Sequence, residues 1–434
     1  MAGKCTSFYQ ELLEGLHICF SSRYVSKAVP VQQLPEEMIA EILKRLPVKM
    51  LVQCKSVCKS WARLLKDPIF INMHLRFNSP THIILFNQHY MHSLFISLPL
   101  NPNPNSVLNT QPLRPPPCER EFSIEAYCNG LLLITVIHEK SIILWNPSIS
   151  QYRVVPPSPF FENQRGFCRN FCAIGYNSSE NDYKIITYTY FNRTNYLELL
   201  SLNSNSWKQL PDAENAPYNM KMLGQRPVSI NDAIYLIACD KASYEVLREV
   251  FRMIIRIDLC QERVSVVSPP PNDTGLNIYW IGDINQSLCM RYYSNENYFH
   301  IWSTRDDINW VKLITVSNIP EPNLRGPRPC YVPLCFNENG ELLIRILSYD
   351  TFHRRRHGLV AFDPNEQNYR GFVLQENTIW LEQTIYRDSL VFPDEPSNQT
   401  CSHSFSGSLK KMLIRFSHTI LSRFACNATS RMRF

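Results

Sequence analysis

The hydrophobic positions divide this chain into two unequal parts with different periods. Between residues 34 and 76, apolar residues return every three or four positions, as on one face of a helix. From about residue 80 to 393 they come instead in short runs that end in Asn, Asp, Gly or Pro, the pattern of strands and turns. The pattern predicts a small all-α module followed by a large all-β domain.

The helical part is expected to form three or four short helices. Pro47 ends the first stretch, because a proline biases the residue before it away from helical geometry. Asp67, ahead of Pro68, is expected to cap a last helix from Ile69 to Leu75. The apolar stripe of the first stretch is Ile39, Ile42, Leu43 and Leu46, and the face of the second is Leu51, Cys54, Lys55 and Cys58.

A helical module of this size is marginal when it stands alone. Trp61, Leu64 and Leu65 continue its apolar pattern, and Leu46 and Leu64 are expected in its core. Some of the other apolar residues must therefore pack on the rest of the chain or contact a partner.

The large part shows a loose internal repeat of strands and polar turns. One unit starts at Cys128, Asn129 and Gly130, the next near Ala173, and later units start near Ser229, Ile281 and Pro333. A period of roughly 45 to 60 residues suits the four-stranded blades of a β-propeller. Each unit also contains a strand with an aromatic residue.

The two ends of this β domain are expected to pair with each other. Segment 82–100 supplies two strands of an incomplete blade, and segments 379–383 and 389–392 could complete it. Closure removes the exposed sheet edges. This count gives six blades, and a propeller of five or seven blades is kept as an alternative. The basic cluster 353–357 is expected in a solvated loop between the strands Leu342–Ser348 and Gly358–Phe362.

Charge and cysteine usage narrow the function classes. The net charge is +6, and residues 396–434 hold six Lys and Arg and no acid, so the tail carries the whole excess. No nucleic-acid interface is therefore expected on the large domain. Leu409, Met412, Leu413, Phe416, Ile420, Leu421 and Phe424 fall on one helical stripe of that tail. A basic amphipathic helix of this kind could bind a membrane surface or a partner groove, pack on the body, or remain frayed.

The 15 cysteines are scattered without CxxC spacing, which favours a reduced intracellular protein over a disulfide framework or a zinc site. We expect no signal peptide, because Glu11 and Glu14 interrupt the only apolar stretch near the N-terminus, and no membrane span. The sequence does not distinguish between a cytoplasmic and a nuclear location. No nucleophile motif, phosphate loop or metal-ligand set is found, so we expect no catalytic residue, metal or cofactor.

Residues 34–70, LPEEMIAEILKRLPVKMLVQCKSVCKSWARLLKDPIF, resemble an F-box closely. The resemblance implies binding to the Skp adaptor of a cullin-RING ubiquitin ligase. The matching positions that would contact the adaptor are Leu34, Pro35, Ile42, Leu43, Val57, Cys58 and Trp61. A core role in a helical bundle is the competing interpretation of each.

The large domain resembles the F-box-associated domain of plant F-box proteins, which is related to kelch propellers. The motifs that show this are CNGLLLI at 128–134, ILWNPSISQYRVVPPSPF at 143–160, IGYNSSENDYKII at 174–186, LLSLNSNSWKQL at 199–210, PLCFNENGELLI at 333–344 and LVAFDPNEQNYRGFVL at 359–374. The PPSPF run and the general layout are also similar to S-locus F-box proteins of pollen. The resemblance implies an F-box at 31–77 and a propeller at 78–393. The extension at 1–30 and the basic tail at 394–434 depart from the family pattern.

Together these features predict a non-catalytic, substrate-recognition subunit of an SCF-type ubiquitin ligase. The F-box would dock the Skp adaptor, and the propeller would bind a target protein through variable loops. Candidate rims are Asn101–Pro117, Phe160–Asn170, Arg325–Pro329 and His353–His357. The alternative is a carbohydrate-binding or enzymatic propeller whose F-box only controls its turnover. An aromatic channel mouth with paired carboxylates would favour the alternative.

Overall fold

The computed structural model describes residues 36–77, 82–89, 92–99, 111–113, 122–136, 141–159, 171–191, 194–210, 218–219, 226–240, 252–270, 278, 280–293, 298–317, 330–349, 355–372 and 382–392. Contacts group residues 42–403 into one unit, and all interactions described below lie within it.

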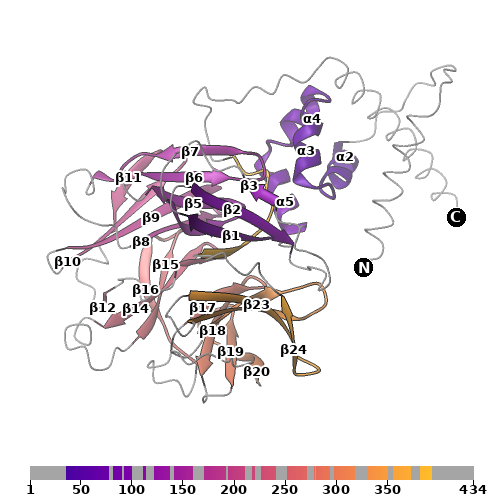
Figure 1. Ribbon diagram of the computed structural model, residues 1–434. Coiled ribbons are helices and arrows are strands. Elements are labelled where there is room, and N and C mark those ends of the chain that lie inside the picture. The colour runs from indigo at the N-terminus through magenta and orange to yellow at the C-terminus, as the bar shows by residue number, and fades with distance from the viewer. Residues whose placement is uncertain are drawn as a thin grey trace. The chain divides into compact units, whose positions relative to one another are not determined.

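Four short helices open the described chain (Figure 1). They are α2 (Glu36–Leu43), α3 (Val48–Cys54), α4 (Lys59–Leu64) and α5 (Pro68–Phe77). The predicted breaks are confirmed. α3 begins directly after Pro47, and the Ile69 amide donates to the Asp67 carboxylate at 2.9 Å at the start of α5.

The described strands form six antiparallel sheets, so the expected propeller with about six blades is confirmed. Sheet A contains β25 (Glu382–Tyr386), β1 (His82–His89), β2 (His92–Pro99) and β3 (Gln111–Leu113). Sheet B contains β4 (Phe122–Cys128), β5 (Leu131–Val136), β6 (Ile142–Asn146) and β7 (Gln151–Val155). Sheet C contains β8 (Phe171–Asn177), β9 (Asp182–Phe191), β10 (Thr194–Ser201) and β11 (Ser206–Gln209).

Each of the remaining three sheets also consists of strands that are consecutive in the sequence (Figure 1). Sheet D contains β12 (Tyr218–Asn219), β13 (Val228–Ile230), β14 (Ala233–Asp240), β15 (Arg252–Asp258) and β16 (Arg263–Val267). Sheet E contains β17 (Trp280–Ile284), β18 (Ser287–Tyr293), β19 (Phe299–Thr304) and β20 (Val311–Val316). Sheet F contains β21 (Cys330–Phe336), β22 (Leu342–Tyr349), β23 (Arg355–Asp363) and β24 (Asn368–Phe372).

The six sheets close into a ring. Among the described residues, one buried apolar cluster fills each gap between neighbouring sheets, including the gap between the last sheet and the first. The ring is completed within sheet A, where Ile385 of β25 pairs with Ile83 of β1. The predicted pairing of the chain ends is therefore confirmed, with the closing strand at Glu382–Tyr386.

Segment 389–392 does not form the expected strand. Its polar groups are bound by a side chain instead, because the Asn146 amide donates to the Val391 carbonyl at 2.7 Å and to the Ser389 carbonyl at 3.1 Å. We name residues 387–392 the closing segment. The expected loop at 353–357 is also shorter than predicted, since Arg355, Arg356 and His357 belong to β23 and pair with β22.

Short turns gather at one end of the sheets, which we name the turn face. They join the first strand of a sheet to the second and the third to the fourth. Asn129, Asn181, Asn231 and Asn285 have positive φ in these turns, a geometry that asparagine tolerates better than most residues. Neighbouring sheets are linked here, for example by the Asn231 amide, which donates to the Gln286 carbonyl at 3.1 Å.

In three of the six sheets, an aromatic residue links the outer strand to the preceding blade. Trp207, Trp310 and Tyr369 lie near the start of the fourth strand of sheets C, E and F. They donate to the carbonyls of Pro156, Ser268 and Ser317, which follow the fourth strand of the sheet before, at 3.0, 2.8 and 2.7 Å. In these three sheets one aromatic residue thus contributes both apolar contact and a hydrogen bond between blades.

Replacing Tyr369 with Phe should remove only the hydrogen bond to Ser317, and we expect a loss of about 1 kcal/mol in the free energy of unfolding. Urea unfolding of the purified chain measures it. An unchanged midpoint and slope would show that this bond contributes nothing to the stability of the ring.

Gly130→Ala and Gly340→Ala form a matched pair that tests the closing segment. Both glycines have positive φ, so alanine is strained at each. At Gly340 nothing lies within 4 Å of the added carbon, whereas at Gly130 that carbon would lie 2.3 Å from Ser389 Cβ. Gly130→Ala should therefore lower the melting temperature more, and should speed proteolysis at 387–392. Equal effects would mean that the closing segment does not pack against this turn.

Candidate functional site

The helices between residues 42 and 77 enclose a small apolar core. Its fully buried members are Leu43, Val48, Leu51, Leu65, Phe70 and Leu75. Leu46 and Leu64, which were expected in the core, are only half-buried. The core therefore forms from α3, α5 and the ends of α2 and α4, and leaves much of the apolar surface of this module outside it.

The predicted adaptor contacts separate into two groups. Ile42, Val57 and Trp61 are half-buried and Cys58 is exposed, so these four reach the surface. Leu43 is only 2% exposed and can support that surface only from beneath. Leu34 and Pro35 lie outside the described residues.

Cys58 does not share a face with Leu51, Cys54 and Lys55 as expected. α3 ends at Cys54, and Cys58 has extended backbone angles as the N-cap of α4. Its sulfur accepts a hydrogen bond from the Trp61 amide at 3.5 Å. The break moves Cys58 to the start of α4, beside Trp61 in the same helical turn.

His74 fastens α5 to the turn between α2 and α3. Its side chain is 1% exposed, and its Nε2 lies 3.0 Å from the Leu46 carbonyl, which can only accept, so Nε2 carries the proton. Burial lowers the pKa of His74 below its usual 6.5, and the bonds to Leu46 and the Asp388 charge oppose that shift only in part. Burial therefore favours the neutral imidazole, although the Leu46 bond alone would favour the charged form.

The helical module is basic, which a charge count over residues 1–395 does not show. Residues 31–77 contain eight Lys and Arg and four Asp and Glu, whereas residues 78–395 contain 27 Lys and Arg and 32 Asp and Glu. The net charge of residues 1–395 is zero only when the charges of all its parts are added together. Counting charge for each predicted module would have shown it. Val52 and Ile69 are exposed on the same helices, at 37% and 79%.

Three contacts join α5 to the propeller. The Asn72 amide donates to the Tyr176 hydroxyl at 2.9 Å, and the Arg387 guanidinium donates to the Leu75 carbonyl at 2.8 Å. Leu75 also belongs to the apolar cluster between sheets B and C. The closing segment thus contacts the helices as well as the ring.

Lys55 adds an electrostatic contact to the same joint. Its ammonium lies 3.9 Å from the ring centre of Phe392, the last described residue of the closing segment. Burial, and then the charge of Lys66, lower the pKa of Lys55 to about 8. The cation–π contact is therefore present in full only below that pH.

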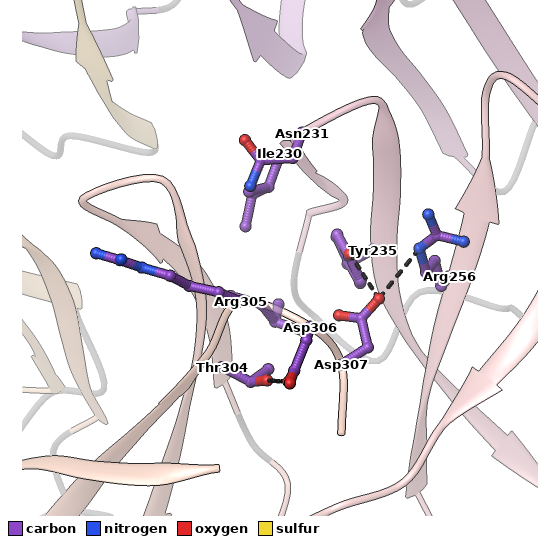
Figure 2. A pocket seen from close by; sticks show the side chains of 9 residues that line it. Ile230, Asn231, Tyr235, Arg256, Thr304, Arg305, Asp306 and Asp307 are labelled. Carbon is purple, nitrogen blue, oxygen red and sulfur yellow. Dashed lines mark hydrogen bonds and ion pairs between the residues drawn. The ribbon is translucent and has the colours of Figure 1, made fainter. Parts of the chain in front are cut away.

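A second candidate site is a cavity of about 320 Å³ on the turn face between sheets D and E. Figure 2 shows Tyr235 and Arg256 directed at one oxygen of Asp307, at 3.0 and 3.1 Å. Burial, and then the Asp307 charge, raise the pKa of Tyr235 to about 12, so the tyrosine keeps its proton and donates. Sequence reasoning missed this site, because its residues are far apart along the chain.

The predicted binding rims fall largely outside the described residues. Phe160–Asn170 and Arg325–Pro329 do so entirely. Of Asn101–Pro117 the structure describes only β3, and of His353–His357 only the start of β23. In these described parts of the chain, no group of three or more His, Cys, Asp and Glu side chains could hold a metal ion, and no helix is long and apolar enough to cross a membrane.

Comparison with known families matches both modules. Residues 31–76 match the F-box-like family model, and residues 82–385 match the F-box associated beta propeller domain. An F-box protein of Arabidopsis thaliana is 27% identical over 326 residues, which cover 69% of this chain and 82% of that protein. An F-box/kelch-repeat protein of the same plant is 24% identical, with 67% and 74% covered, and jacalin-related lectin 38 is 25% identical, with 81% and 70% covered. The resemblance to S-locus F-box proteins stays a prediction.

His74 should make the stability of the helical module depend on pH. Its pKa is lowered in the folded chain, so the unfolded chain binds more protons as the pH falls below about 6.5, and stability is lost there. His74→Gln keeps an N–H that can reach the Leu46 carbonyl but does not titrate. Thermal unfolding from about pH 7.5 to 5 should show a steeper loss for wild type than for His74→Gln. Parallel profiles would contradict this role.

Proposed function

We propose that this chain, which belongs to the F-box associated beta propeller family, is the target-binding receptor of an SCF-type ubiquitin ligase. Its F-box docks the Skp adaptor, and through it a cullin-RING ligase. Its propeller binds a target protein for ubiquitination and degradation. Two of the relatives reported above are F-box proteins of Arabidopsis thaliana, which supports a role in substrate recognition.

The observation that carries the proposal is the surface of α3 and α4. Val57, Cys58 and Trp61 reach solvent at matching F-box positions, and the helical core is already filled without them. Exposed apolar residues clustered around a half-buried tryptophan are typical of protein interfaces. We assign Ile42 to the same surface, with Leu43 beneath it, and keep Leu34 and Pro35, which lie outside the described residues, as contacts proposed from sequence.

Charge adds specificity to this surface. Exposed basic residues lie on the same helices as the proposed contacts, among them Lys49, Lys59 and Arg63. A partner with acidic groups around an apolar centre would associate faster and in one orientation. The acidic propeller repels such a partner, so the charge pattern also directs the adaptor to the F-box.

The proposed contribution to the reaction is proximity. A receptor holds a target lysine near the ubiquitin thioester of the conjugating enzyme, which raises its effective concentration without a catalytic residue on the receptor. The closing segment suits this role, because it binds the helices and the ring together. The chain is proposed to act in the cytoplasm or nucleus, where its free thiols remain reduced.

The described cavity gives little support to the alternative that the propeller binds carbohydrate. Its lining has one aromatic residue, Tyr235, whose hydroxyl is already bound to Asp307. Its two arginines and two aspartates, with few apolar atoms, form a mixed surface of the kind that contacts proteins. The similarity to jacalin-related lectin 38 supports this alternative only through the word lectin in the name of that protein.

Replacing Leu34 and Pro35 with Ala should weaken capture of the Skp adaptor by at least tenfold, since anchor residues of tight interfaces contribute on the order of 2 kcal/mol each. The matched control is Val154→Ala with Val266→Ala, two valines that are 58% and 54% exposed on outer strands of the propeller. Pull-down and calorimetry with purified adaptor measure both. Full capture by the Leu34→Ala/Pro35→Ala variant would show that these contacts are assigned wrongly.

A further inference from the structure

Ion pairs and hydrogen bonds fix the side chains inside the cavity between sheets D and E. Arg256 is fixed between two carboxylates, with its Nη2 2.8 Å from Asp258 and its Nε 3.1 Å from Asp307. Tyr235 donates to the same Asp307 oxygen. These contacts hold the Asp307 carboxylate in one orientation before any ligand arrives, which lowers the entropy lost on binding.

Among the described residues, partners are found for only one oxygen of Asp307, and the other is available to a ligand. Arg256 and Tyr235 both bind Oδ2, and Figure 2 shows the second oxygen on the side away from Arg256, toward the open space beside Ile230. The Asp307 side chain is 24% exposed, so this oxygen lies in a partly dry site where a charged hydrogen bond is stronger than in water.

The charged residues beside Asp307 already form hydrogen bonds within the protein. Asp306 accepts from the Asn309 amide at 2.8 Å and from Thr304 at 3.0 Å, and these turn contacts, led by the Asn309 amide, hold its pKa well below the usual range. Arg305 is anchored by its Nε, which donates to Ser287 at 3.2 Å. Asp306 therefore stays ionised at the cavity as a fixed negative charge.

The charges around the cavity favour a cationic ligand. Arg256 and Arg305 line the cavity together with Asp306 and Asp307, and Asp258 pairs with Arg256, so this group carries three aspartates against two arginines. The propeller segment as a whole has more acids than bases. An ammonium or guanidinium group would reduce this local excess, whereas a carboxylate or phosphate would increase it.

An apolar strip continues from the cavity along the same turn and strand. Ile308, Val311 and Leu313 are 76%, 67% and 45% exposed. The β20 register shifts opposite Ile301 and Trp302, and a bulge of this kind discourages a further strand from pairing with the edge. A partner would therefore meet the strip through side chains.

We propose that this cavity and strip form a target-recognition site for a peptide segment with a Lys or Arg followed by an apolar residue. The cation binds the open Asp307 oxygen, Arg305 donates to a backbone carbonyl of the same peptide, and the apolar residue packs on Ile308 and Val311. The inference rests on the proposed receptor function and names the chemistry of the target. It places one binding site on the turn face, apart from the rims expected from sequence.

Short labelled peptides in a Gly-Ser background test the site on the purified full chain. One position holds Lys, Arg, norleucine or Glu, and a following position holds Leu. Fluorescence polarisation should show the Lys and Arg peptides binding about tenfold more tightly than the norleucine peptide, the size of one charge-assisted hydrogen bond. Asp307→Asn should remove this preference. Equal binding of the norleucine peptide, or no binding of any basic peptide, would overturn the proposal.

Two further variants keep the test independent of folding. Ile308→Ser changes an exposed residue without touching the Arg256 ion pair, and it should weaken every Leu-containing peptide. Glu338→Gln removes an exposed carboxylate from a turn of sheet F and should change nothing. Adaptor capture measured on the same proteins separates the two proposals. Capture that persists while the peptide preference is absent would reject the cavity and leave the receptor function standing.

Discussion

The pairing of β25 with β1 is the interaction on which the rest of the structure depends. It joins residues about 300 positions apart, so the chain must lose much conformational freedom before the ring closes. Without it, sheet A would be incomplete, and the apolar clusters on both of its sides would face water. The pairing with β25 also covers the edge of β1 that would otherwise be left without a partner strand.

The closing strand gives the segment after it a second role. Residues 387–392 leave the ring beside the turn of sheet B, where Asn146 binds their carbonyls, and then contact the helices through Arg387 and Phe392. One continuous stretch thus completes the propeller and holds the F-box to it. Loss of closure would therefore also loosen the adaptor-binding end of the proposed receptor.

The features that the sequence predicted are those set by local chemistry. Pro47 and Asp67 mark helix ends because their constraints act on the next few residues, and the repeat was visible because each blade has its own turns and aromatic residue. The position of Cys58 was missed because helical periodicity cannot show a break without Pro or Gly. The cavity was missed because Tyr235, Arg256 and Asp307 meet only when sheets D and E lie side by side. The basic F-box was overlooked because charge was summed over too long a segment.

Adaptor binding and target binding are proposed to occupy separate modules of one joined chain. Hydrogen–deuterium exchange of the purified chain, with and without the Skp adaptor, tests this most directly. We expect new protection of the amides from Ile42 to Trp61, while the strands and turns of sheets D and E keep their exchange rates. Protection of the propeller turns with no change in α3 and α4 would contradict it.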